Sequence, residues 1–287
     1  MTQERTNSRQ RPASQQFDAN GINIHYLDWG EGSPRHLVLL HGLTSHAHTW
    51  DYFAKEASDS FRVVAPDLRG HGESGYAEDG YTLGRFGEDV RALVRYLNLP
   101  TFDLVGHSLG ALIAIRFTAE NPELVNRLVL VDGGPGLDSG SAREGARGSF
   151  VRPLGFETIE EAKAWHRERN PNRSDEMLEQ RVKYGMKQNW AGWWVLRHDP
   201  ELYWLLEDGS SGFRQEEQAL WEMLGNIPCP VLVLRGQESL LLSSKGAQRM
   251  AEATPNAKLV EIPGAGHSIP SDAPDLFKDA VLEFLRE

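Results

Sequence analysis

The residue with the clearest chemical potential is Ser108, in the stretch GHSLG of residues 106–110. This G-x-S-x-G pattern follows the apolar run FDLV and opens a segment with helical spacing that begins at Ala111. A serine on a tight turn between a strand and a helix, flanked by small residues, projects its hydroxyl from the edge of a sheet. A free serine hydroxyl is a poor nucleophile until a base activates it. The pattern therefore predicts nucleophilic acyl transfer, provided that a base is present.

Four stretches of the chain together resemble the α/β-hydrolase family. HLVLLHGLTSHAHTW (36–50) is similar to the family's strand and HG turn, and APDLRGHGES (65–74) to its D-x-R-G-x-G-x-S loop. LVGHSLGA (104–111) resembles the nucleophile turn, and VEIPGAGHSIP (260–270) the late strand and loop that carry a histidine. The resemblance runs from about residue 17 to 287 and agrees in order and spacing.

The resemblance implies roles for three further residues. His267 is the expected general base, which takes the proton of Ser108 during attack and returns it to the leaving alcohol. The backbone N–H groups of Leu43 and Leu109 are expected to form the oxyanion hole for the tetrahedral intermediate. The remaining histidines, including His41 and His71 in the family's turns, are interpreted as structural.

The catalytic acid is missing from its usual place. By the resemblance it is expected three or four residues after Gly236, where the chain has Ser239 and Leu240. Neither side chain can stabilise an imidazolium. Asp132, at the end of the preceding strand, and Glu238 are the two available substitutes. We favour Asp132, because the same histidine nitrogen can be reached from either strand end, and keep Glu238 as the alternative.

These residues predict a serine hydrolase that cleaves a carboxylic ester or lactone through an acyl-enzyme. Relatives that use an aspartate nucleophile, the haloalkane dehalogenases and epoxide hydrolases, are disfavoured because the position holds Ser108. A carbon–carbon hydrolase is an alternative, weakened by His107 before the serine and Ser268 after the histidine. A ligand receptor without turnover on the same fold is a second alternative, for which the missing acid is the main support.

The elements that must position these residues follow a strand–helix alternation. Short β-rich runs occupy 22–29, 36–40, 61–67, 102–107, 125–132 and 230–236, and several of them are continuously apolar, as in strands buried on both faces of a parallel sheet. Helical spacing occupies 84–99, 108–122, 243–254 and the end of the chain from residue 275. The pattern predicts a doubly wound, mostly parallel α/β sheet.

One segment interrupts this alternation. Residues 135–226 are first glycine-rich and then charged, with no convincing strand, and are predicted to be a helical cap. The core is predicted to comprise 17–134 and 227–287, after a flexible tail of residues 1–16. The cap is rich in tryptophan, which suits a mostly apolar substrate pocket. The candidate pocket residues are Trp190, Trp193, Trp194 and Trp204.

Composition excludes several other classes. The 287 residues carry 41 acidic and 30 basic side chains, a net charge of −11, which argues against a nucleic acid partner. A single cysteine and a polar start without a signal-like run predict a cytoplasmic protein without disulfides, and no apolar run is long enough to span a membrane. We expect a small-molecule substrate and neither a cofactor nor a metal, because no phosphate-binding or dinucleotide motif is present.

Overall fold

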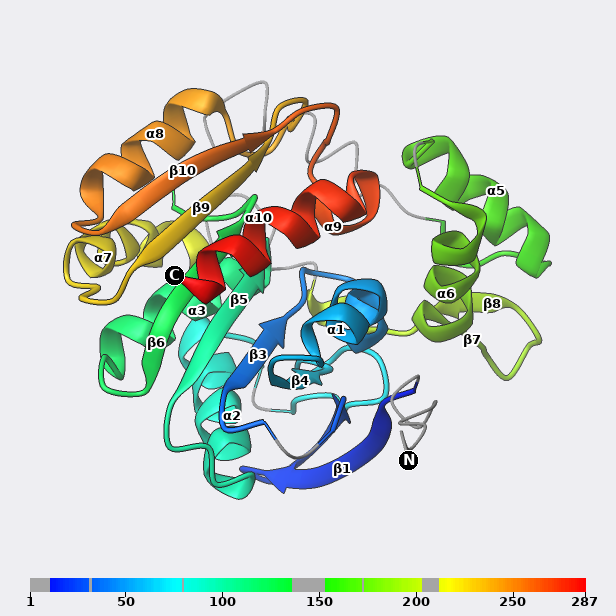
Figure 1. Cartoon of the computed structure of the whole chain (residues 1–287). Coiled ribbons are helices and arrows are strands. Elements are labelled where there is room, and N and C mark those ends of the chain that lie inside the picture. The colour runs from blue at the N-terminus through cyan, green and yellow to red at the C-terminus, as the bar shows by residue number, and fades with distance from the viewer. Residues whose placement is uncertain (1–10, 31–32, 79, 136–152, 172, 203–211) are drawn as a thin grey trace, which may run out of the picture.

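The apolar runs of the sequence form one mixed sheet (Figure 1). The computed structural model describes residues 11–30, 33–78, 80–135, 153–171, 173–202 and 212–287. Within these residues the sheet has eight strands, in the order β1-β2-β4-β3-β5-β6-β9-β10. Their bounds are β1 (Ala13–Ala19), β2 (Ile22–Asp28), β3 (His36–Leu40), β4 (Arg62–Pro66), β5 (Phe102–His107), β6 (Val125–Val131), β9 (Val231–Gly236) and β10 (Ala257–Ile262).

The strands from β4 to β10 in this order are parallel, whereas β1 and β2 are antiparallel to their neighbours. His107 at the end of β5 lies opposite Val131 at the end of β6, and Val131 lies opposite Leu234 of β9. The loops that follow these three strands therefore emerge side by side. We call this side of the sheet the carboxyl edge; it is where open α/β sheets bind their ligands.

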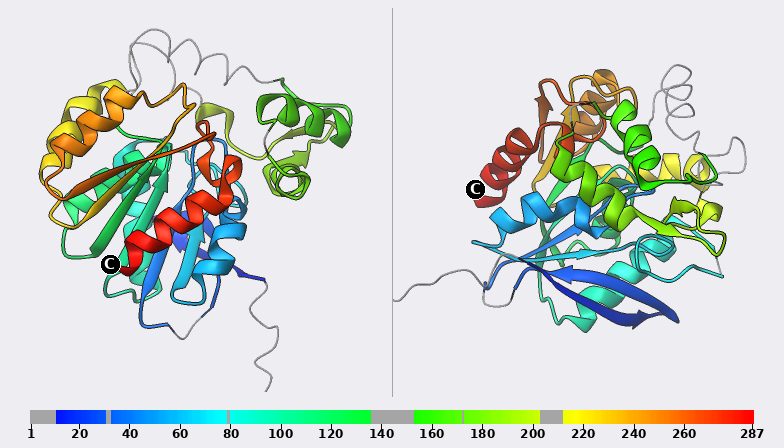
Figure 2. Two further views of the ribbon diagram at one scale, coloured as in Figure 1. Left: turned by 45° about the horizontal axis from the view of Figure 1, so that its top comes forward. Right: turned by 90° about the vertical axis from the view of Figure 1, so that its right-hand side faces the viewer.

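Helices cover both faces of the sheet (Figure 2). One apolar cluster joins the sheet to side chains such as Phe86, Ile113 and Leu224, and a second joins it to Phe53 and Phe277. The helices of the core are η1 (Ala47–Trp50), α1 (Asp51–Ala57), α2 (Leu83–Tyr96), α3 (Leu109–Glu120), α7 (Gly212–Gly225), α8 (Ser244–Ala253), α9 (Ile269–Asp272) and α10 (Pro274–Arg286). None of the helices in the described part of the chain is long and apolar enough to cross a membrane.

The predicted α/β fold is confirmed. The six apolar runs correspond to β2, β3, β4, β5, β6 and β9, and the four segments with helical spacing correspond to α2, α3, α8 and α10. Burial explains this success, because β5 and β9 are buried along their whole length and are apolar at most of their positions.

The predicted N-terminal tail of residues 1–16 is too long. Strand β1 begins at Ala13 and pairs with β2, with Ala13 opposite Asp28. The first four side chains of β1 are exposed, and its buried residues are Phe17 and Ala19 near the end of the strand, so the first half has no apolar pattern that the sequence could reveal. Residues 1–10 lie outside the described part of the chain.

The boundaries of the predicted cap at 135–226 also need correction. Helix α7 packs beside α3 and α8, and its Leu220 and Leu224 belong to the core cluster. The rest is a separate group beside the sheet (Figures 1 and 2), which we call the inserted segment, residues 153–202. It contains α5 (Ile159–Arg169), α6 (Asp175–Gly185) and a hairpin of β7 (Met186–Gln188) and β8 (Trp194–Leu196), whereas no strand was predicted there.

Candidate active site

Ser108 lies on a strained turn between β5 and α3. Its φ of 55° and ψ of −114° fall outside the regions that side chains ordinarily adopt, at a cost on the order of 1–3 kcal/mol. Glycines make the turn possible: a Cβ on Gly106 would lie 2.2 Å from the Gly110 oxygen, and one on Gly110 would lie 2.2 Å from the Leu40 oxygen. The sequence pattern at this turn therefore reflects a steric requirement.

His267 lies in the loop between β10 and α9. Its Nε2 is 3.1 Å from the Ser108 Oγ, so the hydroxyl can donate its proton to the ring. Its Nδ1 is 2.7 Å from Oδ2 of Asp132. The structure thus brings Ser108, His267 and Asp132 into one chain of hydrogen bonds.

Asp132 follows β6 directly and is completely buried. Two further donors hold its carboxylate: the Gly236 N–H is 3.0 Å from Oδ1, and the Ser239 hydroxyl is 2.6 Å from Oδ2. The aspartate itself has a positive φ of 44°, which a turn residue such as Asp tolerates better than most. The carboxylate therefore keeps one orientation toward the histidine.

Ser239 is the residue that sequence reasoning left unexplained. Besides donating to Asp132, its Oγ accepts the backbone N–H groups of Leu241 and Leu242 at 3.2 and 3.3 Å. In the sequence the signal was a short hydroxyl side chain at the position where the acid is expected. Its contact with Asp132 is not visible there, because the two residues are 107 positions apart. Ser239, which stands where the acid is expected, thus supports the Asp132 carboxylate at the end of the neighbouring strand.

Glu238, the alternative acid, is exposed and makes no described hydrogen bond to His267. Its backbone N–H donates to the Ala265 carbonyl at 2.9 Å, and the residue lines the pocket beside the site. The arrangement therefore brings Asp132 to the histidine, while the part of each carboxylate in catalysis stays a prediction.

His107, inside the nucleophile turn, ties the histidine loop to β5. Its Nε2 is 2.9 Å from the carbonyl oxygen of His267. Burial, followed by the charge of His267, lowers the pKa of His107 to about 3, so the ring is neutral at pH 7. Since a carbonyl only accepts, Nε2 carries the proton and donates it. A fixed neutral ring therefore anchors the backbone of His267.

The expected oxyanion-hole residues lie on either side of Ser108. Leu109 is the first residue of α3, directly after the nucleophile. Leu43 follows Gly42, and a Cβ on Gly42 would lie 3.1 Å from the Ser108 Cβ, so this turn approaches the serine closely. Both backbone N–H groups are thus next to the nucleophile, and their role stays a prediction.

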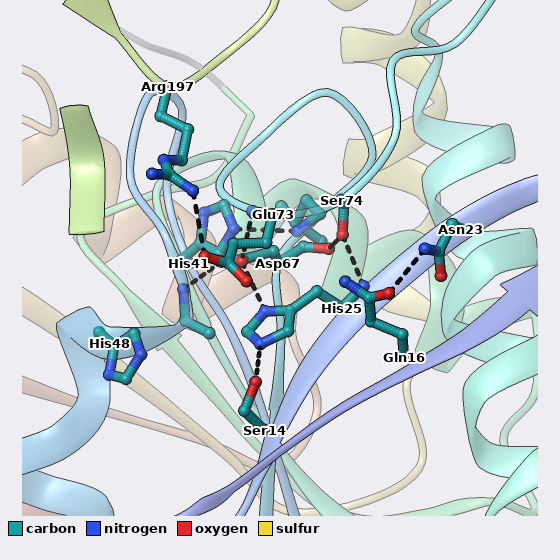
Figure 3. A network of polar contacts seen from close by, with 12 residues as sticks. Ser14, Gln16, Asn23, His25, His41, His48, Asp67, Glu73, Ser74 and Arg197 are labelled. Atoms are coloured by element: carbon teal, nitrogen blue, oxygen red, sulfur yellow. Dashed lines mark hydrogen bonds and ion pairs between the residues drawn. The ribbon is translucent and has the colours of Figure 1, made fainter. Parts of the chain in front are cut away.

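A buried polar network supports the loop that carries Leu43 (Figure 3). Asp67 accepts the N–H of Ala47 at 2.6 Å, the ring of His25 at 2.8 Å and the N–H of Glu73 at 2.9 Å. Burial opposes ionisation, but the hydrogen bond from His25 and neighbouring positive charge hold the pKa of Asp67 well below its ordinary value. His41 accepts the Leu68 N–H at 3.0 Å. This contact fits the structural role expected of His41.

A cavity of about 420 Å³ opens beside Ser108 and His267, between the carboxyl edge and the inserted segment. Three of the four predicted pocket tryptophans do not line it. Trp190 is 99% exposed and Trp193 is 44% exposed, while Trp194 packs inside the segment against Phe156 and its neighbours. Trp204 lies outside the described residues. Among the described residues, Trp165 is the tryptophan that lines the cavity.

The lining of the cavity combines apolar and polar side chains. Aromatic side chains of the hairpin face solvent or one another, and periodicity does not tell such positions from ligand-facing ones. Polar side chains of the lining include His46, His48, His166, Arg169, Asn170, Arg173, Gln180, Arg181, Glu238 and Asp272. Among the described residues no group of three or more His, Cys, Asp or Glu is arranged to hold a metal ion.

Comparison with known proteins agrees with this geometry. Residues 37–280 match the alpha/beta hydrolase family. The chain is 28% identical over 277 residues to 2-(acetamidomethylene)succinate hydrolase of Mesorhizobium japonicum, with 95% of each chain covered. It is 31% identical over 253 residues to 3-hydroxybutyrate-oligomer hydrolase of Cupriavidus necator, covering 85% of this chain and 86% of the relative.

A solved structure of E-2-(acetamidomethylene)succinate hydrolase matches with a TM-score of 0.84 at 26% identity, covering 96% of this chain and 100% of the other. The family match spans the parallel strands of the sheet, the turn of Ser108 and the loop of His267. This chain therefore belongs to the alpha/beta hydrolase family.

Proposed function

We propose that this hydrolase cleaves a carboxylic ester or lactone through an acyl-enzyme formed on Ser108. The observation that carries the proposal is the unbroken chain of hydrogen bonds from Ser108 through His267 to Asp132, with links of 3.1 and 2.7 Å. These three residues come from the loops after β5, β10 and β6, which meet at the carboxyl edge. A hydroxyl, an imidazole and a buried carboxylate in this order constitute an activated nucleophile.

In the first half of the reaction, the Ser108 oxygen attacks the carbonyl carbon while His267 Nε2 takes the hydroxyl proton. Asp132 keeps the Nδ1 proton in place and stabilises the imidazolium that forms. The N–H groups of Leu43 and Leu109 receive the negative charge that develops on the carbonyl oxygen. When the intermediate collapses, the proton passes from His267 to the alcohol, which leaves.

In the second half, the same groups act on water. His267 takes a proton from a water molecule that attacks the acyl carbon, and the proton then returns to Ser108 as the acid is released. Ser239 and Gly236 matter in both halves, because their two hydrogen bonds hold the buried Asp132 carboxylate in place beside His267. The ester assignment is also supported by the relative named 3-hydroxybutyrate-oligomer hydrolase, since an oligomer of a hydroxy acid is joined by ester bonds.

We further propose that the inserted segment acts as a cap over the site. Helix α6 contacts the loop after the HG turn: Arg181 Nη2 donates to the Thr44 carbonyl at 2.9 Å. The ring of Tyr184 stacks on His48, with centroids 3.4 Å apart and an angle of 12° between the rings. These contacts hold the segment against the core at the wall of the cavity.

Hydrolysis of a neutral ester, 4-nitrophenyl hexanoate, tests the proposal in wild type and in Ser108→Ala. We expect turnover by the wild type and a loss of kcat of at least about 10⁴-fold in the variant, because the remaining groups cannot form an acyl-enzyme. A fluorophosphonate probe should label the wild type on Ser108 and leave the variant unlabelled. Equal hydrolysis by both proteins together with an unlabelled wild type would refute the proposal and favour a ligand receptor.

A further inference from the structure

The cavity beside Ser108 holds three guanidinium groups from the inserted segment, those of Arg169, Arg173 and Arg181. Two of them have evident structural contacts. Arg181 donates to the Thr44 carbonyl at 2.9 Å, and the Arg169 guanidinium lies 4.0 Å from the ring centroid of Trp165. These contacts leave Arg173 as the arginine whose position in the cavity needs another explanation.

Arg173 is partly buried, and its side-chain hydrogen bond is a long one, 3.3 Å from Nη2 to the hydroxyl of Ser271. Asp272 lies nearby, but no carboxylate of the described residues comes within 4.0 Å of the guanidinium. Burial lowers the pKa of Arg173 from its ordinary value, with the charge of Asp272 opposing. A cation removed from water without a close counter-charge is unfavourable.

Other enclosed arginines of this protein are paired with carboxylates. Arg69 lies 2.6 Å from Asp89, and Arg235 lies 2.9 Å from Glu261. The lack of a paired carboxylate is therefore specific to Arg173 among these three arginines. It indicates that the counter-charge is supplied by something that enters the cavity.

The location of Arg173 is suited to contact a substrate. Ser271, its hydrogen-bond partner, belongs to α9, which begins two residues after His267. The charge of Arg173 also contributes to the low pKa of His107, next to the nucleophile. The guanidinium thus lies in the same cavity as Ser108, on the side of the histidine loop.

A second side chain in the cavity also lacks a partner. His46 is 2% exposed, and neither of its ring nitrogens has a hydrogen bond within the described part of the chain. Burial lowers the pKa of His46 well below its ordinary value, so at pH 7 the ring offers one neutral N–H donor. Buried donors without partners are rare and costly. The cavity lining therefore includes a neutral polar ring besides the charged guanidinium groups.

We propose that Arg173 binds a carboxylate of the substrate, remote from the bond that Ser108 attacks. The substrate class is then an anionic ester or lactone, such as a half-ester of a dicarboxylic acid, rather than a neutral apolar one. A guanidinium suits this role because two of its N–H groups match the two oxygens of a carboxylate. This inference rests on the proposed hydrolase function and adds the charge of its substrate.

A matched pair of esters tests the inference: the mono-4-nitrophenyl ester of adipic acid and 4-nitrophenyl hexanoate, which share a six-carbon acyl chain. We expect wild type to prefer the anionic ester in kcat/KM. In Arg173→Gln this preference should fall about 10- to 100-fold, mainly through KM, as expected for loss of a charge-assisted hydrogen bond. Arg197→Gln is the control, because it removes the same charge from the inserted segment at an ion pair with Glu73.

Binding gives a readout that does not depend on turnover. Calorimetry on Ser108→Ala should detect monomethyl adipate, and binding should weaken to the same degree when Arg173→Gln is added. An adipate preference or affinity that changes no more in Arg173→Gln than in Arg197→Gln overturns the inference. Hydrolysis of the hexanoate ester without an adipate preference in wild type also overturns it, yet leaves the hydrolase function standing; absence of turnover and of phosphonate labelling removes the function itself.

Discussion

The carboxyl edge of the sheet and the inserted segment form opposite walls of one cavity, and they are built differently. At the carboxyl edge the buried Asp132 carboxylate is held by three hydrogen bonds, from Gly236, Ser239 and His267. In the inserted segment, Arg173 has one long hydrogen bond and Trp190 is almost fully exposed. Side chains that several hydrogen bonds hold in one orientation suit chemistry that needs a fixed geometry. Side chains with few contacts suit recognition that differs between substrates.

This comparison predicts the largest effects at the carboxyl edge. Asp132→Asn should lower kcat for 4-nitrophenyl hexanoate by up to about 10⁴-fold, because an amide cannot stabilise the imidazolium. Glu238→Gln is the matched control and should stay within about threefold, since its carboxylate is exposed. Steady-state kinetics on both folded variants decides which of the two carboxylates is the catalytic acid. A large loss at Glu238 instead would show that the loop after β9 rearranges during the reaction.

A double variant sharpens the same point. The hydroxyl of Ser239 and the Nδ1 of His267 bond the same oxygen of Asp132, so an acid at 239 would approach the ring. We expect Asp132→Asn with Ser239→Asp to recover at least about tenfold in kcat over Asp132→Asn alone, because a carboxylate again faces the imidazolium. Measured kcat no higher than that of the single variant would mean that the backbone after β9 holds residue 239 too far from the ring.

A further prediction concerns the free energy of unfolding at acidic pH, which the buried histidines of the core should lower. Burial lowers the pKa values of His41, His46, His71 and His107, the last to about 3. Below pH 6.5 the unfolded chain binds protons that these folded rings resist, so the free energy of unfolding must fall as pH decreases. His107, with its pKa of about 3, accounts for a loss on the order of 1 kcal/mol by pH 5.5, and the other three rings add to the loss in the same direction.

Urea unfolding at pH 7.5 and 5.5 measures this loss. The stability that the neutral rings provide is fully present above about pH 6.5 and declines toward lower pH, for His107 until about pH 3. An unfolding free energy that is constant between these two pH values would contradict the prediction. Such a result would mean that the four rings take up protons in the folded protein.

A smaller effect is expected at Ser239. Ser239→Ala removes one donor to a buried carboxylate and should lower the free energy of unfolding by about 1.5–3 kcal/mol. Ser244→Ala, at the start of α8, is the control, because no hydrogen bond of its hydroxyl is described. Urea titration of the three proteins gives the values. Equal stability of both variants would show that water replaces the Ser239 hydroxyl beside Asp132.

The smallest effect is expected at the outer surface of the inserted segment. Trp190→Ala should leave kcat/KM within about twofold, since the side chain is 99% exposed and does not line the cavity. Trp165→Ala should raise KM, because its ring lines the cavity and stacks under Arg169. Ester kinetics on the pair tests this assignment. A larger loss at Trp190 than at Trp165 would place the substrate outside the cavity.

The sequence predicted best where burial and sterics constrain residue type. The apolar strands, the glycines around Ser108 and the loop of His267 all appear as local patterns, because each reflects a requirement within a few neighbouring residues. Predictions failed where contacts between distant parts of the chain determine the position of a strand or a side chain. Strand β1 has an exposed polar face, and Trp190 and Trp194 look alike in sequence although one faces solvent and the other packs inside.

By itself, then, the sequence determined the α/β fold, the nucleophile turn and two candidate acids for one histidine. Only the tertiary structure decided that Asp132 faces His267, that Ser239 supports it and that Arg173 and Trp165, rather than Trp190, line the cavity. The physical reason is distance along the chain. Local steric and apolar patterns are visible in neighbouring residues, but a hydrogen bond across 107 or 135 positions depends on how the strands align.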